Sequence, residues 1–219
     1  MLPSSLSRML AVFDAFSLES PTLTAEEIMA RLGYSRGTAY RYVRELVAVG
    51  FLARAGGGAF TLGPRIIELD FTIRQCDPVL HAAAPWMLAL RRKFECDVLL
   101  TAFYDGHVVV TQHEFGNSEI RMSYGRGRAM PLFKGAPSKA ILSALPPARQ
   151  RKIYDANSRQ IAAAGLGVRW EDFKAALLHL RKAGHCITFA ELDAGNVGVA
   201  VPLVVEPTFF GSLALVLGD

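Results

Sequence analysis

Cysteine is scarce in this 219-residue sequence. The three cysteines, Cys76, Cys96 and Cys186, lie far apart and form no C-x-x-C pair. Disulfide frameworks use even numbers of cysteines in short secreted chains, and structural zinc sites use closely spaced pairs. The sequence therefore predicts buried thiols and neither a disulfide framework nor a zinc site.

Long apolar runs are also missing. No stretch approaches the roughly 18 uninterrupted apolar residues that a membrane span needs. The start, MLPSSLSRML, has no basic region followed by an apolar stretch and a cleavage site. We therefore expect a globular protein located in the cytoplasm.

Charge of one sign is only slightly in excess, with a formal net charge of +4. Such a balance is compatible with a polyanionic partner and does not require one. Because 51% of the residues are apolar, the chain can bury at least one full core, and a small domain followed by a larger one is favoured.

The first fifty residues predict three helices. Apolar spacing indicates a helix over residues 4–17. A second helix, over residues 25–32, has Thr24 as N-cap, Glu27 closing a capping box and Gly33 as C-cap. Ser35 can cap a third helix that lasts to about Val49.

A glycine-rich hairpin follows the third helix. The sequence FLARAGGGAFTLG predicts short strands over residues 51–54 and 59–62, joined by three glycines. Three helices and a β-hairpin in this order are typical of a winged helix-turn-helix, which we assign to residues 1–63.

Residues 64–76 predict a linker helix. Pro64 suits its first position, and its apolar residues surround the helix almost completely. A helix of this kind needs partners on several sides, so we expect it to connect two domains and to pack against a second subunit.

The remaining residues, 77–219, predict an α+β domain with a central antiparallel sheet flanked by helices. Helices are expected over residues 78–95, 136–145, 147–157 and 171–183. Strands are expected over residues 97–104, 107–115, 185–191, 196–205 and 209–217, with Asp105-Gly106 as a two-residue hairpin turn.

The third helix gathers long hydrogen-bond donors on the face opposite its apolar stripe. Such a face suits the DNA major groove, where arginine bridges phosphates or guanine edges. We expect Arg36, Gly37 and Tyr40 nearest the bases and Arg41 and Arg44 along the backbone. The alternative is a solvated face of a helical hairpin that serves packing. The order and lengths of the elements favour DNA binding.

Two further contacts complete this prediction. Thr38 can meet a phosphate or a thymine methyl group, and Arg54 on the wing can reach the adjacent groove. The predicted DNA-binding set is Ser35, Arg36, Gly37, Thr38, Tyr40, Arg41, Arg44 and Arg54.

Three segments resemble successive landmarks of the IclR family of bacterial transcriptional regulators. They are LTAEEIMARLGYSRGTAYRYVRELVAVGFLARAGGGAFTLGPRIIEL, AMPLFKGAPSKAILSAL and KAGHCITFAELDAGNVGVAVPL. The resemblance implies a GAF-like effector-binding domain behind the winged helix-turn-helix, and dimers that often pair into tetramers on an operator. Gly37 stands where the family commonly has serine, and APSKA has Pro137 and Ser138 in the middle of the family's loop motif.

The same resemblance places an effector site on the sheet of the second domain, under the loop KGAPSKA and beside the segment FAELDAG and the last strands. Matched by motif, the site comprises Gly135, Ala136, Pro137, Ser138, Thr188, Phe189, Pro202, Leu215 and Leu217. Phe133, Met130 and Tyr124 can add apolar surface. Candidate orienting donors are Thr101, Arg121, Ser138 and the loop amides, because a helix N-terminus favours anions. Leu215, Leu217 and Phe189 can equally be ordinary core residues.

Catalysis and metal binding find little support in the residue pattern. His185 and Cys186, and likewise His113 and Glu114, are strand neighbours that point to opposite faces. Glu191 and Asp193 precede a predicted turn, where solvent exposure is expected. The histidines, His107, His113, His179 and His185, have no metal-ligand spacing.

We therefore expect a ligand-responsive regulator without cofactor that binds a two-fold symmetric operator as a dimer or a dimer of dimers. The apolar site favours an aromatic or otherwise hydrophobic carboxylate over a small hydrophilic acid. The alternatives are a second domain that serves only oligomerisation or that senses a metal.

Overall fold

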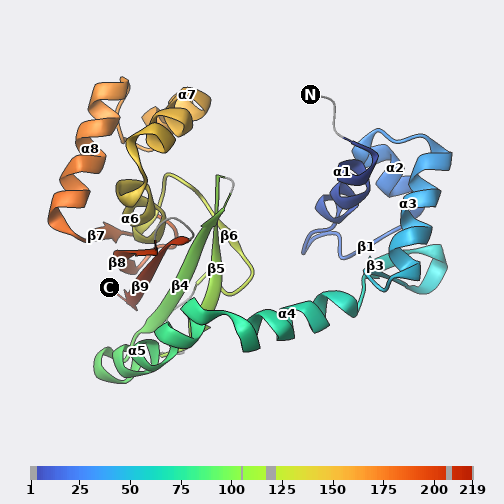
Figure 1. The fold of residues 1–219 in the computed structure, drawn as a ribbon, viewed down its shortest axis with the longest axis horizontal. Coiled ribbons are helices and arrows are strands. Elements are labelled where there is room, and N and C mark those ends of the chain that lie inside the picture. Colours follow the sequence, from blue (N-terminus) through green and yellow to red (C-terminus); the bar gives the residue numbers. More distant parts are fainter. Residues whose placement is uncertain (1–3, 105, 117–121, 206–208, 219) are drawn as a thin grey trace. The chain divides into compact units, whose positions relative to one another are not determined.

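The structure is a computed structural model that describes residues 4–104, 106–116, 122–205 and 209–218. Its internal contacts divide the chain into two compact units, residues 1–77 and 78–219. Figure 1 shows the elements of both units along the chain. No helix in the described ranges is long and apolar enough to cross a membrane.

Unit 1 contains three helices, a 3-10 turn, a small sheet and a final helix. A short helix and the 3-10 turn replace the single helix that was predicted over residues 4–17. The sheet has the order β1-β3-β2, with antiparallel pairs. The elements are α1 (Ser5–Leu10), η1 (Ala11–Ala15), β1 (Thr22–Leu23), α2 (Ala25–Leu32), α3 (Arg36–Ala48), β2 (Leu52–Arg54), β3 (Phe60–Leu62) and α4 (Arg65–Cys76).

Helix α2 has the bounds that its end signals predict. The Thr24 hydroxyl accepts a hydrogen bond from the Glu27 amide at 3.2 Å, and the Glu27 carboxylate accepts one from the Thr24 amide at 2.7 Å. Gly33 ends the helix with φ +65°, a conformation that costs glycine little. The capping box is therefore confirmed.

Burial in unit 1 follows the apolar stripes. Val43 and Leu46 of α3 are buried together with Ile28 of α2 and Leu52 of β2, and Ala39 of α3 is also buried. In α4, the predicted linker helix, Ile67 is 74% and Phe71 63% exposed.

Unit 2 is built on a six-stranded antiparallel sheet with the order β6-β5-β4-β9-β8-β7. Its strands are β4 (Asp97–Tyr104), β5 (His107–Glu114), β6 (Ala129–Met130), β7 (Cys186–Phe189), β8 (Asn196–Val205) and β9 (Phe209–Gly218). Its helices are α5 (Pro78–Phe94), α6 (Ala136–Ala144), α7 (Pro147–Ala163) and α8 (Trp170–Ala183). The predicted α+β class is confirmed, as is the hairpin between β4 and β5.

Several predicted boundaries differ from the structure, and one strand was not predicted. The strand predicted over residues 185–191 covers only Cys186–Phe189. Helix α7 was expected to end at Asn157, which has a non-helical φ of −135°, but the helix resumes and continues to Ala163. The two-residue strand β6 was not predicted, because so short a segment carries no periodicity.

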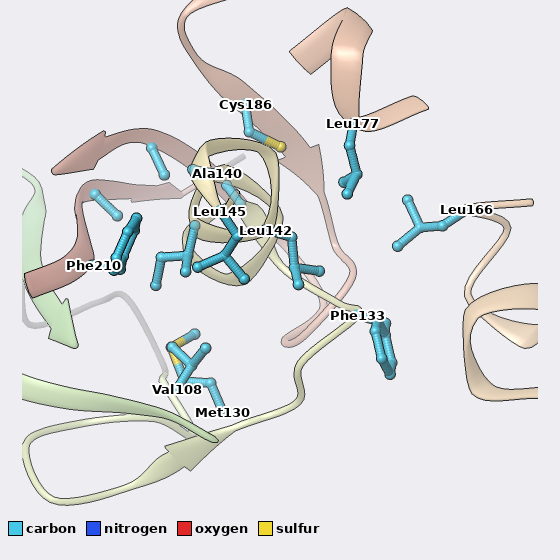
Figure 2. Packing of buried hydrophobic residues seen from close by; sticks show 14 of the residues in the cluster. Val108, Met130, Phe133, Ala140, Leu142, Leu145, Leu166, Leu177, Cys186 and Phe210 are labelled. Atoms are coloured by element: carbon cyan, nitrogen blue, oxygen red, sulfur yellow. The ribbon is translucent and has the colours of Figure 1, made fainter. Parts of the chain in front are cut away.

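The sheet is covered on both faces. Helix α6 lies on one face, where Val216, Ala214 and Phe210 of β9 join the main core. Helix α5 lies on the other, where Val98 and Leu100 of β4 are buried with Met87. Figure 2 shows side chains of the main core, including Ala140, Leu142, Leu145, Leu177, Cys186 and Phe210.

The core packing of α6 can be tested with a pair of leucines. Leu142→Ala is expected to lower the free energy of unfolding by about 2–5 kcal/mol, because its side chain is fully buried and a cavity remains. Leu178→Ala, on an exposed position of α8, is expected to change it by less than about 0.5 kcal/mol. Urea unfolding monitored by circular dichroism measures both. Equal effects would contradict the assigned core.

Candidate functional site

The N-terminus of α3 is fixed by Ser35. Its hydroxyl accepts a hydrogen bond from the Thr38 amide at 3.4 Å and donates one to the Thr38 hydroxyl at 2.9 Å. Ser35 therefore acts as the N-cap and orients the first turn of the helix.

The predicted donor face of α3 is present on the surface. Ala39, Tyr42 and Val43 are buried on one side. Arg44 forms an ion pair with Glu45 at 3.2 Å, which contributes little because both side chains are exposed. The exposed residues on the opposite side are Arg36, Gly37, Tyr40, Arg41 and Arg44.

Of the three tyrosines in residues 34–46, Tyr40 alone lies on the donor face. The hydroxyl of Tyr34 donates to the Arg8 carbonyl at 2.7 Å, and that of Tyr42 is paired with Ser5 at 3.0 Å. Both tyrosines therefore serve the fold of unit 1.

The Tyr40 hydroxyl donates to the Glu26 carboxylate across a distance of 2.5 Å. This hydrogen bond raises the pKa of Tyr40 and lowers the pKa of Glu26. The Arg36 guanidinium lies over the Tyr40 ring, 5.5 Å from its centroid. Glu26 thus holds Tyr40 in place and puts one negative charge at the edge of the donor face.

Arg54 lies on β2 of the wing and is exposed. Its guanidinium is 5.9 Å from the centroid of Phe60 on β3. The turn Gly56–Gly58 forms a short 3-10 segment in which Gly57 and Gly58 have φ of +70° and +78°. Glycine suits these positive φ values, so the tight wing turn depends on it.

Unit 2 contains a small cavity of about 40 Å³ at the first turn of α6. It is bounded by α6, by strands β7, β8 and β9, and by the segment between β7 and β8. Its apolar lining is Leu99, Met122, Tyr124, Met130, Ala136, Pro137, Leu192, Gly198 and Val216, and its polar lining is Thr188, Glu191, Asp193 and Asn196.

Part of the predicted effector set meets at this cavity. Ala136, Pro137 and Thr188 line it, together with Tyr124 and Met130. Gly135 lies beside it as the N-cap of α6. Ser138 is fully buried in α6, and its hydroxyl has no hydrogen-bond partner among the residues that the structure describes.

Other members of the set lie away from this cavity. Leu215 and Leu217 pack with the α5 core on the opposite face of the sheet, because side chains alternate along β9. Phe189 pairs with Val197 on β7 and is 70% exposed. Leu215, Leu217 and Phe189 were chosen by motif, without regard to strand parity.

Three of the remaining candidates do not line the cavity either. Thr101 is buried, and its hydroxyl is 2.7 Å from that of Ser212. Pro202 of β8 pairs with Ser212 of β9, and Phe133 belongs to the main core. Arg121 lies outside the residues that the structure describes.

The resemblance puts the segment FAELDAG, residues 189–195, beside the site, and three of its residues line the cavity. Glu191 and Asp193 were expected in a solvated turn and were not named as site residues, but both line the cavity with Leu192, although Glu191 is also exposed. Thr188 of β7 is paired with Gly198 of β8, so Thr188 and Gly198 lie on the same face of the sheet. The alternation of side chains along the two strands could have predicted this.

Hydrogen bonds attach this segment to the first turn of α6. The Ala136 amide donates to the Thr188 hydroxyl at 3.1 Å, and the Gly135 amide donates to the Glu191 carboxylate at 2.9 Å. Lys139 forms an ion pair with Glu191 at 2.5 Å. Asp193 accepts hydrogen bonds from the amide and hydroxyl of Ser123.

His113, one of the residues considered for catalysis and metal binding, has a structural partner. His113 is buried and paired with Asp97 at 3.0 Å, and its ring stacks on Phe115. The described part of the chain contains no group of three or more His, Cys, Asp or Glu residues that could hold a metal. Burial raises the pKa of the Cys96 and Cys186 thiols, which keeps them protonated. Cys76 is exposed, so the prediction of buried thiols is wrong for this residue.

Two family models match the chain. The model of the IclR helix-turn-helix domain matches residues 5–56, and that of the bacterial transcriptional regulator IclR C-terminal region matches residues 72–205. Among curated proteins, the HTH-type transcriptional regulator KipR of Bacillus subtilis is 26% identical over 198 residues, which are 89% of this chain and 77% of the relative. The Pca regulon regulatory protein of Pseudomonas putida is 22% identical over 201 residues, 91% of this chain and 69% of the relative.

Solved structures share the fold. An IclR family transcriptional regulator from Brucella abortus superposes with a TM-score of 0.82 at 22% identity, over 99% of this chain and 82% of the other. An IclR homolog from Microbacterium hydrocarbonoxydans, complexed with 4-hydroxybenzoate, gives a TM-score of 0.77 at 21% identity, over 98% and 89% of the two chains.

The two buried serines of α6 are expected to respond differently to loss of their hydroxyl groups. Ser143 donates to the Ala140 carbonyl at 2.7 Å, so Ser143→Ala is expected to cost about 0.5–1.5 kcal/mol of unfolding free energy. Ser138→Ala removes a buried hydroxyl without a partner and is expected to leave stability unchanged or raise it. Melting temperatures of the two variants measure the difference. Equal losses would mean that the Ser138 hydroxyl has a partner in the folded protein.

Proposed function

The chain belongs to the IclR family of bacterial transcriptional regulators, and on that premise we propose that it binds a two-fold symmetric operator and senses a small organic acid in unit 2. The family assignment confirms the expectation of a DNA-binding transcriptional regulator with an effector domain rather than an enzyme. The proposal places its action in the cytoplasm, where bacterial DNA lies.

The donor face of α3 supports the details of DNA binding. Its exposed arginines project from the helix that follows the tight turn after Gly33, which is the position of a recognition helix. Arg36, Gly37 and Tyr40 would lie nearest the bases, and Thr38, beside the cap residue Ser35, would meet a phosphate or a thymine methyl group. Arg41 and Arg44 would contact the backbone, and Arg54 on the wing would reach the adjacent groove or its phosphates.

A dimer or a dimer of dimers is the proposed assembly. Two-fold operators are read by paired recognition helices. The exposed apolar residues of α4, with Ile67, Phe71 and Ile73 each more than half exposed, supply a surface that a second subunit could cover.

The cavity at the first turn of α6 is the proposed effector site. It combines an apolar wall with a few polar groups, the usual composition of a small-molecule site. The Microbacterium hydrocarbonoxydans protein of the same fold is complexed with 4-hydroxybenzoate, which supports an organic acid as effector and an aromatic one as the first candidate.

The proposed regulation requires that the effector favour one of two conformations of the chain. Residues 64–76 are proposed as the linker between the DNA-binding domain, residues 1–63, and the effector domain, residues 77–219. Occupancy of the cavity would then change the spacing of paired recognition helices through this helix.

Arg41→Ala is expected to weaken binding to the DNA upstream of the gene and to lower the slope of log affinity against log salt by about one, because one phosphate contact is lost. Fluorescence anisotropy across a salt series measures both quantities. The control is Arg159→Ala, which removes the same charge from an exposed position of α7. Identical behaviour of the two variants would contradict the assignment of α3 as the recognition helix.

Gly198→Val is expected to fill the cavity. A Cβ at this position would lie 3.2 Å from the Thr188 hydroxyl and 3.4 Å from the Ala136 Cβ, so a larger side chain occupies the space of the ligand. Benzoate and 4-hydroxybenzoate should therefore raise the melting temperature of the wild-type protein and raise that of the variant much less. Gly218→Val, where a Cβ meets no atom within 4 Å, is the matched control. Equal shifts in all three proteins would place the ligand elsewhere.

A further inference from the structure

An ion pair lies beside the cavity and joins the first turn of α6 to the segment between β7 and β8. The side chain of Lys139 is 12% exposed and that of Glu191 is 30% exposed. Their charged atoms are 2.5 Å apart, and the second carboxylate oxygen of Glu191 accepts the Gly135 amide at 2.9 Å. Glu191 thus occupies the place where a cation and a helix amide together favour a carboxylate.

The Glu191 carboxylate compensates the positive charge of Lys139. Within the described residues, Glu191 is the one acidic side chain that forms a salt bridge with Lys139. The Lys139 side chain is largely covered, and removing the partner of a covered charge leaves that charge uncompensated and is unfavourable. If Glu191 moves away, another anion at the same place would restore the balance.

Ligand entry requires the segment of residues 190–195 to move. The cavity of about 40 Å³ is far smaller than the hundreds of Å³ that ligand pockets usually provide. Leu192 closes it from this segment and lies directly over Gly135, where a Cβ would be 2.6 Å from the Leu192 Cδ1. Ala190, at the start of the segment, has φ +49°, an unfavourable conformation for a residue with a Cβ.

We propose that the effector's carboxylate displaces the carboxylate of Glu191 and becomes the partner of Lys139 and the Gly135 amide. Leu192 follows Glu191 in the chain, so the same movement enlarges the cavity for the apolar part of the ligand. This inference rests on the proposed effector function and specifies its ligand class: a monocarboxylate with an apolar body. The Glu191 carboxylate then competes with the acid for Lys139 and the Gly135 amide, and this competition sets the affinity for the acid.

The test compares carboxylates with neutral molecules of the same shape. Binding of acetate, propionate, benzoate and 4-hydroxybenzoate, and of the corresponding primary amides, is measured by calorimetry on the full chain. Glu191→Gln keeps the size of the side chain and removes its charge. Glu171→Gln removes the same charge from an exposed position of α8, away from the cavity.

In Glu191→Gln, at least one acid should bind at least tenfold more tightly than to the wild-type protein, because its competitor is weakened. The matching amide should change by less than about threefold, and Glu171→Gln should behave as the wild type. Acids that bind Glu191→Gln no more tightly, or an equal gain for acid and amide, would overturn the displacement. Acid binding to the wild-type protein would then still support the effector function, whereas binding of none of the compounds to any of the proteins would contradict both.

Lys139→Met provides a second, independent variant. It is expected to abolish the preference for acid over amide, because the positive partner of the carboxylate is lost. This result holds even if Glu191→Gln does not fold. A Lys139→Met protein that binds the acid as tightly as the wild type would also overturn the proposal.

Discussion

The close packing of α6 on β8 and β9 is the constraint on which the rest of unit 2 depends. Ala136 and Ala140 present small side chains to the sheet and are fully buried. At Gly198, a Cβ would come within 3.4 Å of the Ala136 Cβ, so a larger side chain there would have to displace its neighbours. The close packing of α6 on the sheet brings its first turn to Thr188, and the cavity lies beside this turn.

Because α6 lies so close to the sheet, the backbone amides of its first turn need hydrogen-bond partners there. The first amides of a helix have no partner within the helix, and near α6 they are met by Thr188 and Glu191. The cavity therefore lies beside backbone amides whose hydrogen bonds are accepted by side chains of other segments. In unit 1 the N-cap residues Thr24 and Ser35 accept hydrogen bonds from amides in the first turns of α2 and α3. They fix α2 and α3 so that one face of α3 is buried and the other presents its arginines to the surface.

Most of the fold could be predicted from the sequence, because local chemistry determines it. Thr24, Glu27 and Gly33 define α2, and strands β4 and β8 have the bounds that their apolar runs predict. The donor face of α3 also follows from helical periodicity. Each of these signals lies within a few residues of the element that it defines.

The effector cavity could be predicted only in part, because it is formed by segments that are distant in sequence. Glu191 meets Lys139 across 52 positions, and no local pattern indicates this pair. Leu215 and Leu217 were assigned to the wrong face because the parity of β9 depends on its pairing with β4 and β8.

The most direct test of the account measures whether the two units are coupled. The affinity of the full chain for the DNA upstream of its gene is determined by anisotropy with and without a saturating carboxylate that raises the melting temperature, together with the DNase footprint. The account predicts a change in affinity of about 5–150-fold, the usual range of coupling between two sites, and an altered footprint. An unchanged affinity and an unchanged footprint would contradict it.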